Sequence, residues 1–132
     1  TALSLVLGLA SGVNVAGSQV RIEPEVLNLA ETYFEALRTG DLQALLSLLA
    51  RDERAGIETQ LSDPAYTDFL IDRYRNARLE IGGSGAKGDY RFVDITIWIN
   101  DSESFRERLI LQPNDDSAGR SMHIVAREAL HN

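Results

Sequence analysis

The sequence predicts an α+β fold in which N-terminal helices pack on a curved, four-stranded antiparallel meander. Apolar residues recur with the 3.6-residue period of a helix as far as Asn76 and alternate with a period of two after it. Capping residues and turn sequences divide both halves into short elements. The 132 residues, 44% of them hydrophobic and 25% charged, have the composition of a single globular domain. Helices followed by strands are typical of the α+β class.

The clearest helix is expected over residues 24–39. Pro24 suits the first helical turn, and Gly40 suits the left-handed residue that follows a helix. The apolar residues between them follow helical spacing: Val26, Leu29, Ala30, Tyr33, Phe34 and Leu37. This spacing predicts one buried face along the whole helix.

Two further helices are expected before Asn76. Asp41 is a good N-cap for the first, whose leucines repeat the same spacing. Asp63 and Pro64 predict the start of the other. Its expected apolar stripe is Tyr66, Phe69, Leu70 and Tyr74. Residues 51–61 lie between these two helices and fit neither period clearly.

Four strands are expected after Asn76. The first is short and contains Leu79 and Ile81, and the run 82–88, which holds four glycines, is interpreted as a flexible hairpin loop. Strands are expected over about 92–99, 104–112 and 121–128. In the last strand, alternation places Met122, Ile124 and Ala126 on the core face, and Ser121, His123, Val125 and Arg127 on the other face.

The first residues are a separate matter. Residues 2–16 carry no charge, and the apolar stretch 3–10 is too short to span a bilayer as a helix. Val15 and Gly17 suit the small-residue positions before a cleavage ahead of Ser18. Residues 1–17 are therefore interpreted as a truncated export signal or as an ordered terminal strand or helix. Residues 18–132 are expected to form the single functional domain.

Composition lowers the expectation for several classes of partner and cofactor. The chain has no cysteine, which excludes disulfides and thiolate metal sites. Its net charge of −7 repels phosphate backbones, so we expect no nucleic-acid partner. We also expect no membrane span, and no cofactor or metal. Gly83, Gly85 and Gly88 match the spacing of a dinucleotide fingerprint, but the residues after them predict a strand where that motif needs a helix.

The first helix pair resembles the opening of the nuclear transport factor 2-like superfamily, and in particular its SnoaL-like members. The matching residues are Phe34, Ala36, Gly40, Asp41, Leu45 and Leu49. With the order of helices and strands, the resemblance covers about residues 20–128. It implies a curved sheet wrapped round the long helix to form a cone. Such cones often hold a small-molecule pocket and often dimerise through the sheet face.

Glu107 is the most interesting polar residue on the predicted core face. If Phe105, Leu109 and Leu111 face the helices, alternation places Glu107 beside them. A carboxyl group there must be paired, or burial raises its pKa. Tyr33, Tyr66 and Tyr74 are the candidate phenol donors to a ligand in the same cavity. The competing interpretation places Glu107 at a sheet edge or in an ion pair with Arg78 or Arg91.

Three functions are carried forward. The first is a non-catalytic domain, exported to the periplasm or outside the cell, that binds a small apolar ligand or self-associates as a homodimer through its sheet. The second is a SnoaL-like isomerase, dehydratase or cyclase in which Glu107 is the weak catalytic candidate. The third is an accessory protein that binds another protein. Without export, the location would be cytoplasmic. The superfamily includes both enzymes and non-catalytic proteins, so the resemblance implies no particular catalytic residue.

Overall fold

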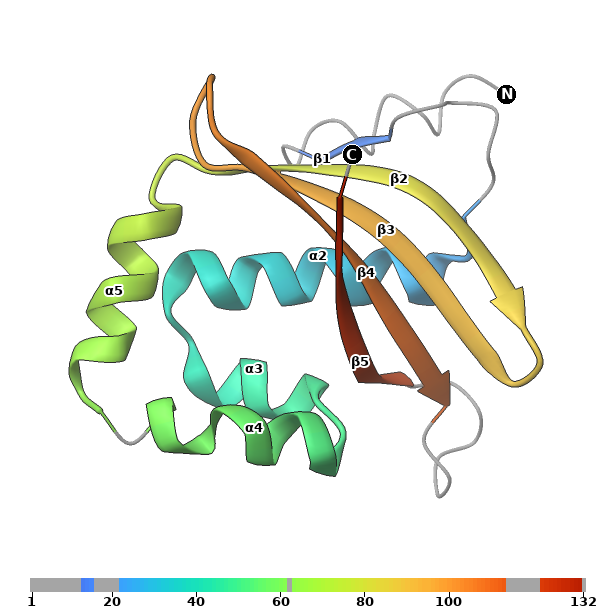
Figure 1. Ribbon diagram of the computed structural model, residues 1–132, viewed down its shortest axis with the longest axis horizontal. Coiled ribbons are helices and arrows are strands. Elements are labelled where there is room, and N and C mark those ends of the chain that lie inside the picture. Colours follow the sequence, from blue (N-terminus) through green and yellow to red (C-terminus); the bar gives the residue numbers. More distant parts are fainter. Residues whose placement is uncertain (1–12, 16–21, 62, 114–121, 132) are drawn as a thin grey trace.

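The computed structural model describes residues 13–15, 22–61, 63–113 and 122–131, which form four helices and five strands (Figure 1). The helices are α2 (Pro24–Thr39), α3 (Leu42–Leu48), α4 (Arg51–Leu61) and α5 (Ala65–Tyr74). The strands are β1 (Val13–Val15), β2 (Arg78–Lys87), β3 (Tyr90–Trp98), β4 (Ser104–Pro113) and β5 (Met122–Leu130). This order confirms the predicted α+β class.

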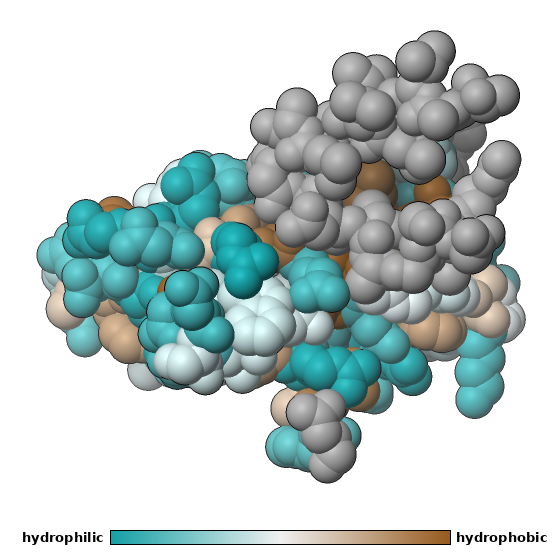
Figure 2. All heavy atoms as spheres, turned by 90° about the horizontal axis from the view of Figure 1, so that it is seen from above, coloured by the Kyte–Doolittle hydropathy of each residue, from teal (hydrophilic) through white to brown (hydrophobic). Residues whose placement is uncertain are grey.

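The sheet has the strand order β1-β2-β3-β4-β5 and curves around α2. Strands β2 to β5 form the expected antiparallel meander, and β1 adds a short parallel pairing with β2. The helices lie on one side of the sheet, which we call its inner face (Figure 1). The opposite side is the outer face. Seen from above, its described part is mostly hydrophilic or intermediate, with smaller hydrophobic areas (Figure 2).

The core lies between α2 and the inner face. It consists of apolar residues, several of them less than 2% exposed: Leu45, Leu49, Leu79, Ile81, Val93, Ile95, Ile97, Leu109, Leu111 and Ile124. The buried residues of α2 are those that its periodicity predicts, with Ala36 in addition. Among the described residues, the phenols Tyr33 and Tyr74 are the only buried side chains that carry a polar group. The core is therefore a conventional apolar one, and polar groups meet only at its margin.

The connection between α2 and α3 follows the predicted capping chemistry. Gly40 has a φ of 67°, and the N–H groups of Gly40 and Asp41 donate to the carbonyls of Leu37 and Ala36. This is the hydrogen-bond pattern of a glycine-terminated helix. The Asp41 side chain then accepts from the N–H of Ala44 at 3.1 Å. One residue thus ends α2, and the next caps α3.

Two helical regions differ from their predictions. Residues 51–61, which fit neither period, form α4. Among its described side chains, those of residues 51–60, only Ile57 is buried, which explains why the sequence there shows little apolar periodicity. On α5, Leu70 and Tyr74 are buried as expected, but Phe69 is 54% exposed. The interpretation of Phe69 as part of a buried stripe is wrong, because its ring stacks on Tyr66 instead of entering the core.

The interpretation of residues 82–88 as a flexible loop is also wrong. Strand β2 runs through the glycines to Lys87, with a register shift between Ile81 and Ser84. A Cβ on Gly85 would lie 2.7 Å from the ring of Phe92 on β3, so the close approach of that ring requires glycine. The prediction that no helix follows the dinucleotide-like glycines is confirmed, because strand β3 begins at Tyr90.

The prediction for the inner face of β5 fails after Ile124. Ile124 pairs with Leu111, but Ala126 pairs with Ile110, which leaves Val125 as the extra residue of a β-bulge. Beyond the bulge, alternation is reversed. Ala126 therefore lies on the outer face, and Arg127, opposite Leu109, lies on the inner face.

The segment 1–17 lies mostly outside the described residues. Its described part, β1, pairs Val13 with Leu79 and Val15 with Ile81. The interpretation of residues 1–17 as an export signal stays a prediction, because most of these residues lie outside the described ranges. No helix in the described part of the chain is long and apolar enough to cross a membrane.

We expect substitutions of two glycines to change stability in opposite directions. Gly40→Ala should destabilise the domain by about 2 kcal/mol, because an L residue is strained at positive φ. Its Cβ would also lie 3.0 Å from the carbonyl oxygen of Thr67. The matched control is Gly56→Ala in α4, where nothing lies within 4 Å and alanine favours the helix. That control should be stabilising by about 0.5–1 kcal/mol. Urea unfolding of both variants measures the difference, and equal effects would contradict the assigned backbone.

Candidate functional site

The candidate site lies on the inner face of the sheet, where β4 passes α2. Glu107 pairs with Ile95 on one side and Ala129 on the other, so its side chain shares a face with the core. Tyr33, buried on α2 with 3% exposure, donates its hydroxyl hydrogen to Glu107 Oε1 at 2.9 Å. Two of the four residues singled out in the sequence are thus in direct contact.

An ion pair borders this contact. Arg127 Nε donates to Glu53 Oε1 at 2.7 Å, and the two side chains are 23% and 26% exposed. The Arg127 guanidinium also lies close enough to Tyr33 and Glu107 to influence the pKa of each. We call Tyr33, Glu107, Arg127 and Glu53 the inner polar cluster. It joins α2, α4, β4 and β5, which makes it a tie between helices and sheet.

Sequence reasoning missed Arg127 and Glu53. Simple alternation places Arg127 on the outer face, because nothing in the sequence pattern indicates the β-bulge at Val125. Glu53 lies in the segment that fitted no period. A signal was nevertheless present, since an inward carboxyl such as Glu107 requires a polar partner. The partners considered for it are engaged elsewhere: Arg91 pairs with Glu23, and Arg78 lies over the ring of Trp98.

Burial governs the ionisation of the cluster. Desolvation raises the pKa of Glu107, and the Tyr33 hydroxyl and the Arg127 charge oppose this rise without cancelling it. A carboxyl whose folded pKa lies above its unfolded pKa stabilises the fold at low pH. That contribution is lost as the pH rises through the folded pKa. The hydrogen bond from Tyr33 and the charge of Arg127 both stabilise the ionised form of Glu107, and they therefore reduce this loss of stability.

The same burial raises the pKa of Tyr33 far above its ordinary range, with the negative charge of Glu107 as a second cause. The phenol therefore stays protonated throughout the neutral range and acts as a hydrogen-bond donor. Burial also raises the pKa of Tyr74. The chemistry available to the two phenols is donation, and neither is suited to act as a base.

Tyr66 and Tyr74 meet other aromatic rings, and among the described contacts neither phenol is hydrogen-bonded to Glu107. Tyr74 meets Phe105 edge-on, with ring centroids 6.5 Å apart, and Tyr66 stacks on Phe69 at 6.0 Å. Electrostatic coupling links Tyr74 both to Glu107 and to Tyr66. The three tyrosines therefore follow one another from the inner polar cluster towards the aromatic side chains of α5.

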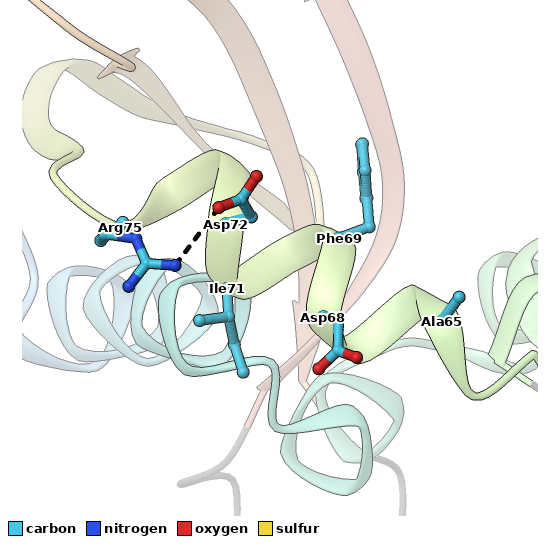
Figure 3. Close-up of a pocket in the computed structure, with 6 residues that line it drawn as sticks. All are labelled: Ala65, Asp68, Phe69, Ile71, Asp72 and Arg75. Atoms are coloured by element: carbon cyan, nitrogen blue, oxygen red, sulfur yellow. Dashed lines mark hydrogen bonds and ion pairs between the residues drawn. The ribbon is translucent and has the colours of Figure 1, made fainter.

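A second concave region lies along α5 (Figure 3). Its volume is about 450 Å³, and Asp72 and Arg75 on its rim form an ion pair at 3.2 Å. Figure 3 shows Phe69 and Ile71 pointing in different directions from the helix. Because the lining side chains do not converge, we treat this region as open surface and not as a site.

Metal binding finds no support in the described ranges. Within them, no three histidine or acidic side chains are grouped so that they could hold a metal ion. The glycines of the dinucleotide-like spacing lie in strand β2 and in the turn after it, and not before a helix.

We expect the Arg127–Glu53 pair to stabilise the domain measurably. Arg127→Met keeps the aliphatic stem but removes the charge, and it should cost about 2 kcal/mol, because Glu53 and Glu107 lose a partially buried partner. A double-mutant cycle with Glu53→Gln in urea unfolding measures the coupling. The control is the exposed pair Arg38–Glu35, which should contribute only about 0.3–0.5 kcal/mol. Equal coupling energies for the two pairs would contradict the geometry.

Comparison of the sequence with protein-family models and with curated proteins finds no match. Solved structures do resemble it. A putative NTF2-like transpeptidase from Campylobacter jejuni is 12% identical, with a TM-score of 0.54 over 76% of this chain and 96% of that one. A putative calcium/calmodulin-dependent protein kinase type II association domain from Thiobacillus denitrificans is 13% identical, with a TM-score of 0.55 over 83% and 97%.

A third structure, Rd1NTF2_04 with long sheet, is 17% identical, with a TM-score of 0.51 over 80% of this chain and 99% of that one. At these identities the likeness concerns the fold alone. It agrees with the observed order of helices and antiparallel strands and with the resemblance of the first helix pair. The chain has the nuclear transport factor 2-like fold.

Proposed function

We propose that this domain is a non-catalytic binding module for a small apolar ligand. The observation that carries the proposal is the aromatic side chains of α5 and β4 beside the inner polar cluster. This aromatic group consists of two ring pairs, Tyr66 with Phe69 and Tyr74 with Phe105. The electrostatic influence of Tyr66 on Tyr74 connects the two pairs. Phe69 is 54% exposed, so part of the aromatic surface is available to a ligand.

The chemistry of this region fits a ligand that is apolar with one polar end. Aromatic faces supply apolar contact, and binding sites commonly place a few polar groups at the end of such a surface. Glu107 provides an acceptor there, and its carboxyl is only partly exposed. In this arrangement the ligand packs on Phe69 and Phe105 and directs a hydroxyl or amide towards Glu107.

The engagement of the polar groups favours binding over catalysis. Tyr33 donates to Glu107, and Arg127 is paired with Glu53. A general base must be within reach of the proton that it abstracts. Here the hydroxyl of Tyr33 already occupies one oxygen of the carboxyl group. The alternative, a SnoaL-like enzyme, would use Glu107 with its raised pKa as the acid or base, and that alternative stays a prediction.

Export completes the proposal. We retain cleavage ahead of Ser18 as the route to the periplasm or the outside of the cell, supported by the uncharged apolar residues 2–16. Self-association through the outer face and binding to another protein stay predictions. On that face, Arg108 forms two hydrogen bonds with Asp94, at 2.7 and 3.0 Å.

Titration with the neutral apolar dye Nile red tests the site. The double variant Tyr66→Ala/Phe69→Ala should bind the dye at least about tenfold more weakly, because the variant loses the aromatic surface. Glu107→Gln should bind within a factor of about three, because an amide oxygen still accepts from Tyr33. The control is Tyr90→Ala, which removes another exposed aromatic residue, at the β2–β3 turn. Native mass spectrometry of protein expressed from its natural start codon should show a small-molecule adduct and the mass of a chain beginning at Ser18.

Two results would oppose the proposal. Dye affinity that falls as much in Tyr90→Ala as in the double variant would place binding elsewhere. A loss of more than about tenfold in biological activity for Glu107→Gln, with unchanged stability, would favour the enzyme instead.

A further inference from the structure

A groove of about 570 Å³ lies at one end of the sheet, where β2 begins and β5 ends. Its lining includes Glu80, Thr96, Trp98, Ser104, Arg106 and Leu130. The volume is within the usual range for small-molecule sites. Phe105 and Glu107, which the proposed function also uses, line this groove, whereas Tyr66, Phe69 and Tyr74 do not. The groove therefore adjoins the aromatic region of α5 but does not include the side chains of that helix.

The strand register places one side of this groove on the outer face, while Phe105, Glu107 and Ala129 border it from the inner face. Glu80 pairs with Thr96, Thr96 with Arg106 and Arg106 with Leu130, so these four side chains form one row across β2, β3, β4 and β5. The adjacent row, which contains Leu79 and Ile97, is buried against the helices. Three strand spacings give the row a length of about 14 Å, which would hold one or two sugar-sized rings.

Trp98 is held in one orientation in this groove. Its Nε1 donates to Glu80 Oε1 at 3.0 Å, and the Arg78 guanidinium lies 5.5 Å from the ring centroid. Across the next strand pairing, the neighbour of Trp98 is Ser104, a small residue. A large side chain thus supports the indole on the β2 side, and a small one leaves space on the β4 side. The ring is preorganised as a flat apolar surface beside that space.

The polar groups around this ring are mixed in kind and balanced in charge. Glu80 supplies acceptors, Arg106 supplies donors, and Thr96 supplies a hydroxyl that does both. Glu107 also borders the groove, but its carboxyl is bonded to Tyr33 on the inner face. One carboxylate and one guanidinium offset each other, so this end of the groove does not select strongly for a charged ligand.

We propose that the outer groove binds an uncharged saccharide. A sugar ring presents polarised C–H groups on one face, and these suit the negative potential of an indole face. Its hydroxyls form the edge of the same ring, where Glu80 and Arg106 accept and donate. A ligand that is flat and apolar on one face and rich in hydroxyls at its edge satisfies the whole lining.

The test uses the fact that Trp98 is the only tryptophan in the chain. The full chain is first applied to an array of neutral and sialylated glycans, and the best neutral glycan is then titrated while Trp98 fluorescence is recorded. We expect saturable binding with a shift in emission. Ser104→Phe, which fills the space beside the indole, should weaken binding at least about tenfold. Phe69→Ala is the control and should bind the glycan as the unaltered protein does.

Several results would contradict saccharide binding in this groove. The absence of saturable binding by any neutral glycan, or a preference for the sialylated ones, would overturn the proposal. So would binding that Ser104→Phe leaves unchanged, once circular dichroism shows that this variant is folded. A homodimer that shields Trp98 from acrylamide quenching would instead assign the groove to a second copy of the chain, which also overturns it. Tyr66 and Phe69, whose substitution is expected to weaken dye binding, do not line the groove, so failure of the glycan test leaves the dye test standing.

Discussion

The bulge at Val125 is the constraint on which the polar interior of this domain depends. A single extra residue in β5 reverses the alternation beyond it and directs Arg127 towards the helices. Without that reversal, Glu107 would lie on the inner face with the phenol of Tyr33 but with no nearby cation. With it, a carboxyl, a phenol and a guanidinium meet at the edge of an otherwise apolar core, and Glu53 on α4 completes the group.

Such a cluster is expected to stabilise the fold, and in the function proposed above it supplies the polar end of the ligand site. It ties the last two strands of the meander, β4 and β5, to α2 and α4, and the apolar packing around it makes its contacts more effective than surface pairs. The same arrangement limits its chemistry, because every member has a protein partner. The molecule therefore offers two different surfaces: an inner one, aromatic with a polar end, and an outer one, built on a single supported indole. Their ligands should differ accordingly.

Residue patterns predicted much of this fold for identifiable reasons. The apolar face of α2, the glycine after it and the capping Asp41 are local signals, and each appears as expected. The inward position of Glu107 followed from alternation in an unbroken strand. The failures occurred where long-range contacts decide. The local sequence at Gly85 is typical of a loop, and only the contact with the ring of Phe92 explains a glycine in a strand there. Simple alternation places Arg127 on the outer face, and only the bulge in β5 explains its inward position.

The most direct test of this account is the pKa of Glu107, measured by NMR titration of its side-chain carboxyl carbon. The account predicts a value above the ordinary 4.5, because burial raises it more than Tyr33 and Arg127 lower it. In Arg127→Met the value should rise further, since a nearby positive charge is removed. An ordinary pKa that does not respond to Arg127→Met would show that the two groups do not meet, and it would contradict the bulge that brings them together.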